Sequence, residues 1–140
     1  MPGMAETMDL ARRLMDALSK HELDAMLDLS HPSVEWHSFF AALGHGSDGV
    51  YRGHEGTRQY VRDLDDAWDA VWAEVDDGVA VGEVALLVGR IHFRGKESGV
   101  ETESATGWVL RFSGGKLIRF DAFRDPDQAI AGLGERLEPS

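Results

Sequence analysis

The 140-residue chain contains no cysteine, which excludes disulfides, thiolate metal ligands and thiol nucleophiles. It also lacks any apolar run close to the roughly 18 residues that would cross a bilayer. Its first residues, MPGMAETMDLARRLMDAL, lack the uninterrupted apolar stretch of a signal peptide. These absences predict a cytoplasmic protein with no membrane partner.

Basic residues are few in this chain. It has 14 lysines and arginines against 25 acidic residues, which gives a net charge of −11. Because phosphate binding needs a basic surface, we expect no nucleic-acid partner.

Two local patterns bear on metals and cofactors. Four histidines (His31, His37, His45 and His54) are close in sequence, but none has the spacing of a helical histidine pair, so no metal is expected. The stretch GHGSDG at 44–49 matches the dinucleotide fingerprint. That fingerprint needs a strand before it and a helix opening on it, and VYRG intervenes here. We therefore expect no cofactor.

The first half of the chain has apolar residues at helical spacing. This spacing predicts helices over 7–18 and 54–70, and a shorter one within SKHELDAMLDLSHP that Pro32 ends. Thr7 is expected to cap the first helix, and Ser19 with Glu22 to form a capping box for the second.

Strand-like segments fill most of the remaining chain. They lie at 33–38, 71–76, 79–93, 100–113 and 116–124, and the last four are separated by DDG, RGKESG and SGGK turns. Helices followed by antiparallel strands predict an α+β fold, a curved sheet with helices on one face. We expect one domain over 1–140, with 126–140 as a loose or short helical tail.

Alternation along these strands separates two sets of side chains. Trp36 and His37 are adjacent, so only one of them faces the core. In the later strands a polar set shares the outer face of the sheet, opposite Ile118, Phe120 and Ala122. This set is Arg90, His92, Arg119 and Asp121. A polar sheet face or dimer contact is the favoured interpretation, and an acid–base cluster is the alternative.

Three longer segments resemble the SnoaL-like group of the nuclear transport factor two-like superfamily. They are LSKHELDAMLDLSHPSVEWHS, GVYRGHEGTRQYVRDLDDAW and SGGKLIRFDAFRD, in the order that the family has them. The resemblance implies an α+β cone, in which a curved antiparallel sheet wraps around three helices and an apolar cavity. It also implies a homodimer through the outer sheet face. Known activities of the group include ketosteroid isomerase, polyketide cyclase and limonene epoxide hydrolase.

The catalytic groups of those enzymes are missing at the matching positions. The general base of the isomerases matches Trp36, their oxyanion tyrosine matches Leu14, and their second oxyanion acid falls at or beside Trp108. The catalytic aspartate of the cyclases and epoxide hydrolases matches Ala122. Asp121 is next to it, and a one-residue bulge would be needed to turn Asp121 inward.

The resemblance therefore predicts an apolar cavity in which Trp36 is a wall. The expected lining is Leu14, Trp36, Phe39, Tyr60, Leu64, Leu87, Ile91, Trp108 and Phe120. We expect a SnoaL-like domain that binds a small hydrophobic molecule of polyketide, steroid or terpenoid type. Whether it is an enzyme stays open; if so, Asp121 or His37 is the expected base and Tyr60 the hydrogen-bond donor. The alternative is a non-catalytic dimeric interaction module with a packed core.

Overall fold

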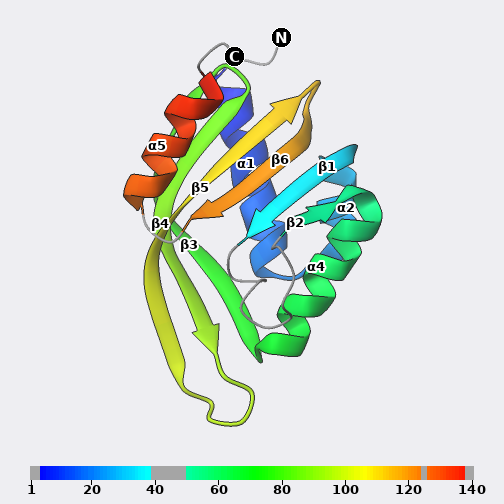
Figure 1. Ribbon diagram of the computed structural model, residues 1–140, viewed down its shortest axis with the longest axis vertical. Helices are drawn as coiled ribbons and strands as arrows, with labels where there is room; N and C mark the ends of the chain where they lie inside the picture. Colours follow the sequence, from blue (N-terminus) through cyan, green and yellow to red (C-terminus); the bar gives the residue numbers. More distant parts are fainter. Residues whose placement is uncertain (1–3, 39–49, 124–125, 138–140) are drawn as a thin grey trace.

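The computed structural model describes residues 4–38, 50–123 and 126–137 of the chain (Figure 1). Its helices are α1 (Met4–Ser19), α2 (Leu23–Leu29), α4 (Gly53–Ala67) and α5 (Pro126–Leu137). Its strands are β1 (Ser30–Ser38), β2 (Val50–Arg52), β3 (Ala70–Val81), β4 (Val84–Arg94), β5 (Glu101–Ser113) and β6 (Lys116–Phe123).

The strands form one six-stranded sheet in the order β2-β1-β6-β5-β4-β3. Every neighbouring pair is antiparallel except β1 and β6, which are parallel. The sheet is curved, and α1 lies behind it in Figure 1 while α5 lies in front. The predicted α+β cone is confirmed.

The main core lies between the inner sheet face and helices α1, α2 and α4. On α1 the residues at helical spacing, Ala11, Leu14, Met15 and Leu18, are all buried. They meet Leu87, Ile91 and other inward residues of β4 in one cluster. Each large apolar side chain buried in this way contributes about 1.5–3 kcal/mol to stability.

A second, smaller core lies on the outer face of the sheet, under α5. Ala129 of α5 is fully buried against Val84, Leu86 and Val109. The helix comes so close that a Cβ added at Gly107 would lie 2.4 Å from the Cβ of Ala129. Glycine at 107 therefore allows α5 to rest on β5.

The predicted helix caps are wrong. Helix α1 begins at Met4, so Thr7 lies inside it, and its hydroxyl donates to the carbonyl of Gly82 at 2.8 Å. Ser19 ends α1 instead of capping α2, and the N-cap of α2 is Glu22 without a side-chain hydrogen bond. Pro32 lies within β1. The two hydroxyls are used in tertiary contacts, and no periodicity of apolar residues reports such contacts.

The predicted DDG turn is also wrong. Strand β3 continues through Asp76–Gly78 with a register shift against β4 between Val75 and Asp77. The hairpin turn comes later, at Gly82, which has the positive φ of 59° that glycine adopts readily. The bulge accommodates the extra residue, so the strand does not end where turn-forming residues cluster.

Strand β6 contains a second bulge that changes its alternation. Arg111 pairs with Arg119 but Phe112 pairs with Leu117, so Ile118 is the extra residue. Ile118 was expected to face inward with Phe120; instead it lines a surface groove with Val81 and Arg111. Leu117 takes the inward position and is fully buried.

Candidate functional site

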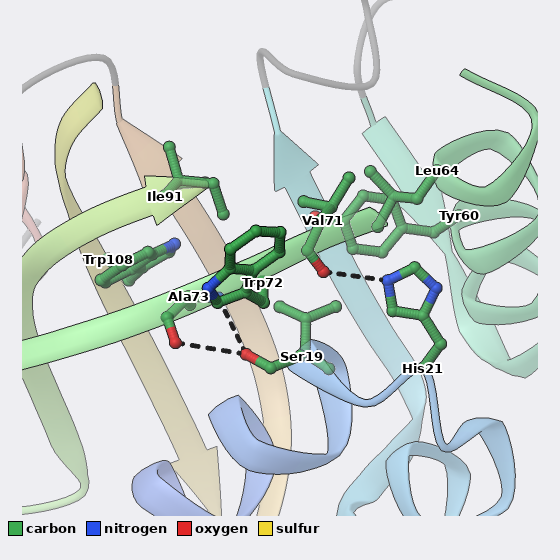
Figure 2. A pocket seen from close by; sticks show the side chains of 11 residues that line it. Ser19, His21, Tyr60, Leu64, Val71, Trp72, Ala73, Ile91 and Trp108 are labelled. Atoms are coloured by element: carbon green, nitrogen blue, oxygen red, sulfur yellow. Dashed lines mark hydrogen bonds between the residues drawn. The ribbon is translucent and has the colours of Figure 1, made fainter. Parts of the chain in front are cut away.

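A pocket opens between the inner sheet face and the ends of α1 and α4 (Figure 2). Its lining combines apolar and aromatic residues of the sheet with residues of the α1 end, the following turn and α4. These are Leu18, Ser19, His21, Tyr60, Leu64, Val71, Trp72, Ala73, Ile91, Trp108 and Ala122. Its volume is about 20 Å³, which is the room of about one water molecule.

Burial divides the pocket into a floor and a rim. Tyr60, Leu64, Ile91 and Trp108 are between 1% and 5% exposed and form the floor. The rim residues are half-buried; they are Ser19, His21 and Ala73. The interior of the pocket is therefore apolar, and its polar groups gather where it meets solvent.

The expected cavity residues separate into two groups. Tyr60, Leu64, Ile91 and Trp108 line the pocket. The others that the structure describes are buried in the adjoining core and do not line it: Leu14, Trp36, Leu87 and Phe120. Phe39 lies outside the described residues.

Trp36 faces inward, which answers the question that the sequence raised about it and His37. Its ring lies 5.3 Å from the ring of Tyr60 and 4.9 Å from that of Phe120. Its Nε1–H donates to the Thr57 hydroxyl at 2.8 Å, so the one polar atom of the indole is satisfied inside the core. Trp36 is a wall of the core, beside the pocket.

His37 and Asp121 lie on the opposite face of the sheet. They are paired across β1 and β6, next to the pair formed by Glu35 and Arg119. Asp121 is only 6% exposed and accepts two hydrogen bonds from the Arg119 guanidinium, at 2.9 and 3.1 Å. Period-two alternation holds at this point, so neither proposed base reaches the pocket.

Glu35 is the charged partner of His37. Its Oε1 lies 2.9 Å from His37 Nε2, and this hydrogen bond is the main reason why the pKa of Glu35 lies below its ordinary value. The nearby positive charges of His37, Arg119 and Arg52 act in the same direction. This outer group is an ion-pair arrangement on a sheet face.

Ala122, which the resemblance matches to the catalytic aspartate of the cyclases, lines the pocket and presents only a methyl group to it. Among the described lining residues, only His21 and Tyr60 are titratable. The acid–base groups available to a bound molecule therefore differ from those expected for the family's enzymes.

His21 and Ser19 are the functional candidates that the sequence did not indicate. His21 Nδ1 contacts the Asp65 carboxylate, and Nε2 lies 3.1 Å from the Val71 carbonyl (Figure 2). The Ser19 hydroxyl accepts a hydrogen bond from the Ala73 N–H at 2.9 Å. The sequence did not indicate His21 because its partners are 44 and 50 residues away along the chain.

The outer face of β3, β4 and β5 carries a second charged group. Arg90 contacts Glu74 at 2.7 Å, Asp76 at 3.2 Å and Glu103 at 3.7 Å. The hydrogen bond to Asp76 is the main cause that raises the pKa of Arg90. Beside them the ring of Trp72 stacks on His92, with centroids 4.9 Å apart. Acid–base pairing of this kind is typical of a solvated or partner-facing sheet surface.

Within residues 4–38, 50–123 and 126–137, no three metal-ligating side chains gather closely enough to hold an ion. In the same segments, no helix has the length and apolar character needed to cross a membrane.

Solved structures with the same fold are numerous, at low sequence identity. An NTF2-like protein of unknown function from Burkholderia pseudomallei K96243 has a TM-score of 0.77 at 20% identity, covering 91% of this chain and 97% of its own. TerC, crystallised with polyporic acid, has a TM-score of 0.75 at 16% identity, covering 93% and 98%.

IdmH from Streptomyces antibioticus, a proposed polyketide cyclase, has a TM-score of 0.71 at 17% identity, covering 91% of this chain and 98% of its own. No curated protein matches the chain. The sequence pattern of the SnoaL-like domain matches residues 11–120. The chain thus belongs to the SnoaL-like domain family.

Proposed function

We propose that this SnoaL-like domain binds a small, rigid, apolar molecule in the pocket between the sheet and α4. The observation that carries the proposal is the pocket lining, where Tyr60, Leu64, Ile91 and Trp108 offer an aromatic and aliphatic floor beneath a polar rim. Ligand sites are commonly built in this way, with few polar groups on an apolar surface. The related fold of TerC, crystallised with polyporic acid, supports the same class of function.

Ligand entry requires the pocket to widen. Sites for drug-sized molecules enclose about 300–1,000 Å³, against about 20 Å³ here. The floor side chains Tyr60 and Leu64 both come from α4, so a displacement of this helix away from β3 and β4 would enlarge the pocket. We therefore propose that the pocket opens when the ligand binds. The cytoplasmic location expected from the sequence is kept as part of this proposal.

The proposed role is binding without the ketosteroid isomerase mechanism. The resemblance matches that enzyme's acid and base groups to Leu14, to Trp36 and to a position at or beside Trp108. Neither leucine nor tryptophan can exchange a proton near neutral pH. The proposed bases Asp121 and His37 lie across the sheet from the pocket. A bound molecule would meet His21 and Tyr60 instead.

The second candidate is a dimeric interaction module with a solid core. The small pocket volume favours it, because eight of the nine expected cavity residues are buried side chains in contact with one another. The outer sheet face supplies a polar surface around Arg90, whose mixed charges suit a second copy of the chain.

Thermal unfolding against a panel of polycyclic ketones, terpenoids and aromatic acids separates the two candidates. A ligand at 100 times its dissociation constant adds about 2.7 kcal/mol to the stability of the folded state. A rise in Tm confined to one chemical class supports the binding function. If no compound raises the Tm and size-exclusion chromatography with light scattering shows a dimer, the interaction module is the better-supported function.

A further inference from the structure

The turn between α1 and α2 places a histidine where glycine is usual. The Glu22 N–H donates to the Ala17 carbonyl at 2.9 Å, and the His21 N–H donates to the Leu18 carbonyl at 3.1 Å. These two bonds form a Schellman motif, whose C′ residue adopts a left-handed conformation and is most often glycine. His21 holds φ at 55° and is the one non-glycine residue with positive φ in the described segments.

An unusual backbone conformation persists when the surroundings fix it, and it clusters at functional sites. The side chain of His21 supplies these surroundings. It links the turn to α4 through Asp65 and to β3 through the Val71 carbonyl. The side chain is 21% exposed and lies at the rim of the pocket. Asp65 and the Val71 carbonyl hold the ring from two directions.

The two partners of the ring have different roles. A carboxylate on one ring nitrogen is the usual means of fixing the orientation of an imidazole, and Asp65 occupies that position at Nδ1. The partner of Nε2 is a carbonyl, which also only accepts. The ring therefore donates from both nitrogens when it carries a hydrogen on each. This carbonyl belongs to β3, the edge strand of the sheet.

We propose that His21, oriented by Asp65, is the donor that recognises a carbonyl oxygen at the edge of the bound apolar molecule. On binding, Nε2–H exchanges the Val71 oxygen for the oxygen of the ligand, and no covalent bond changes. The ligand class is a rigid ring ketone, with its rings on the apolar floor and its oxygen at the rim. This inference rests on the proposed binding function.

Two molecules of nearly equal shape test it, 9-fluorenone and fluorene, which differ by one carbonyl oxygen. Equilibrium dialysis gives the Kd of each for the wild-type protein and for His21→Gly, which keeps the left-handed turn but removes the ring. Asp65→Asn is the second variant, because Asp65 is 55% exposed and its replacement leaves the core intact. Lys20→Ala, an exposed neighbour in the same turn, is the matched control.

The measured quantity is the ratio of the fluorene Kd to the fluorenone Kd. Loss of one hydrogen bond should lower this ratio by about three- to tenfold in His21→Gly, by less in Asp65→Asn, and not at all in Lys20→Ala. Any general change in pocket opening affects both molecules alike and cancels in the ratio.

The outcomes are distinct. An unchanged ratio in a folded His21→Gly protein that still binds both molecules would overturn the role of His21 and leave the binding function standing. A wild-type protein that binds neither molecule, and no member of the wider panel, would overturn the binding function and this inference with it.

Discussion

Trp36 and His37 are neighbours on β1 and end up on opposite faces of the sheet. His37 pairs with Glu35 on the polar face, while Trp36 is fully buried and donates its indole N–H to Thr57. The Thr57 hydroxyl passes its own hydrogen to the Gly53 carbonyl at 2.9 Å. One hydroxyl thus satisfies a donor of the sheet and an acceptor of α4 at the same time.

Replacing Thr57 with valine tests how much the shared hydroxyl contributes to stability. Thr57→Val leaves the Trp36 N–H buried without an acceptor and should lower the free energy of unfolding by about 1–3 kcal/mol. The same change made in a Trp36→Phe protein should cost clearly less, because no indole N–H remains to be orphaned. Urea unfolding of the wild type, the two single variants and the double variant measures the loss of stability caused by Thr57→Val in each background. Equal losses in the two backgrounds would show that the hydrogen bond between Trp36 and Thr57 does not contribute.

The hydrogen bond between Glu35 and His37 should appear in the pH dependence of stability. The pKa of Glu35 is lower in the folded protein than its ordinary value of 4.5, so the folded state binds this proton less tightly than the unfolded state. The contribution is therefore present above pH 4.5 and is lost as the pH falls through the folded pKa.

Thermal unfolding from about pH 6 to about pH 3 checks this, with Glu35→Gln as the comparison. The wild-type Tm should fall more steeply than that of the variant below pH 4.5. Parallel curves would show that the Glu35 carboxylate contributes nothing to stability.

At the scale of elements, apolar periodicity predicted most of the structure and failed where a bulge or a tertiary contact intervenes. The inward set of β4, with Leu87, Ile91 and Phe93, is buried as its alternation predicts. The turn predicted at the DDG segment was wrong because Asp76 is the extra residue of a bulge and β3 continues beyond it. Turn-forming residues cannot be distinguished from bulge residues by composition alone.

The contact between α5 and β5 can be tested by changing the residue on each side of it. A methyl group added by Gly107→Ala would lie 2.4 Å from the Cβ of Ala129, closer than two carbon atoms can approach. We expect this variant to lose about 1–3 kcal/mol of stability as α5 is pushed off the sheet.

Removing the opposing methyl should relieve the clash. The double variant Gly107→Ala/Ala129→Gly should be more stable than the sum of its two single changes predicts, by an amount that chemical unfolding resolves. Strict additivity would mean that α5 does not rest on Gly107.

At the scale of the whole molecule, the sequence predicted the apolar floor but not the rim or the volume. Tyr60 was recognisable because it lies on the apolar stripe of its helix, and Trp108 because the family resemblance placed it in the cavity. The rim depends on His21 meeting Asp65 and Val71, which requires the sheet and α4 to be assembled first. The volume depends on how closely side chains interdigitate, and no pattern of residue types fixes that.

A large cavity can be made where the pocket is now small. Trp108→Ala should cost about 3–5 kcal/mol, because Trp108 is only 1% exposed and its indole would leave a void beside the pocket. Added indole should then raise the Tm of the variant, by about 2.7 kcal/mol of stability at 100 times its dissociation constant.

The control is Val109→Ala on the outer face, where the void is too small for indole and the Tm should not respond. A Trp108→Ala protein that unfolds at the wild-type temperature would show that this side chain is not packed in the core. Failure of indole to stabilise a destabilised variant would show that the core collapses into the space.

The bulge at Ile118 decides which side chains of β6 face the helices. In a regular strand running on from the inward Leu117, Arg119 and Asp121 would both face the helices. The single extra residue puts Phe120 and Ala122 there instead and holds the guanidinium–carboxylate pair outside. A β6 strand of the same residues without the bulge would thus place an ion pair where the aromatic wall now stands. The position of one extra residue thus sets the chemistry of the inner sheet face while the order of helices and strands stays the same.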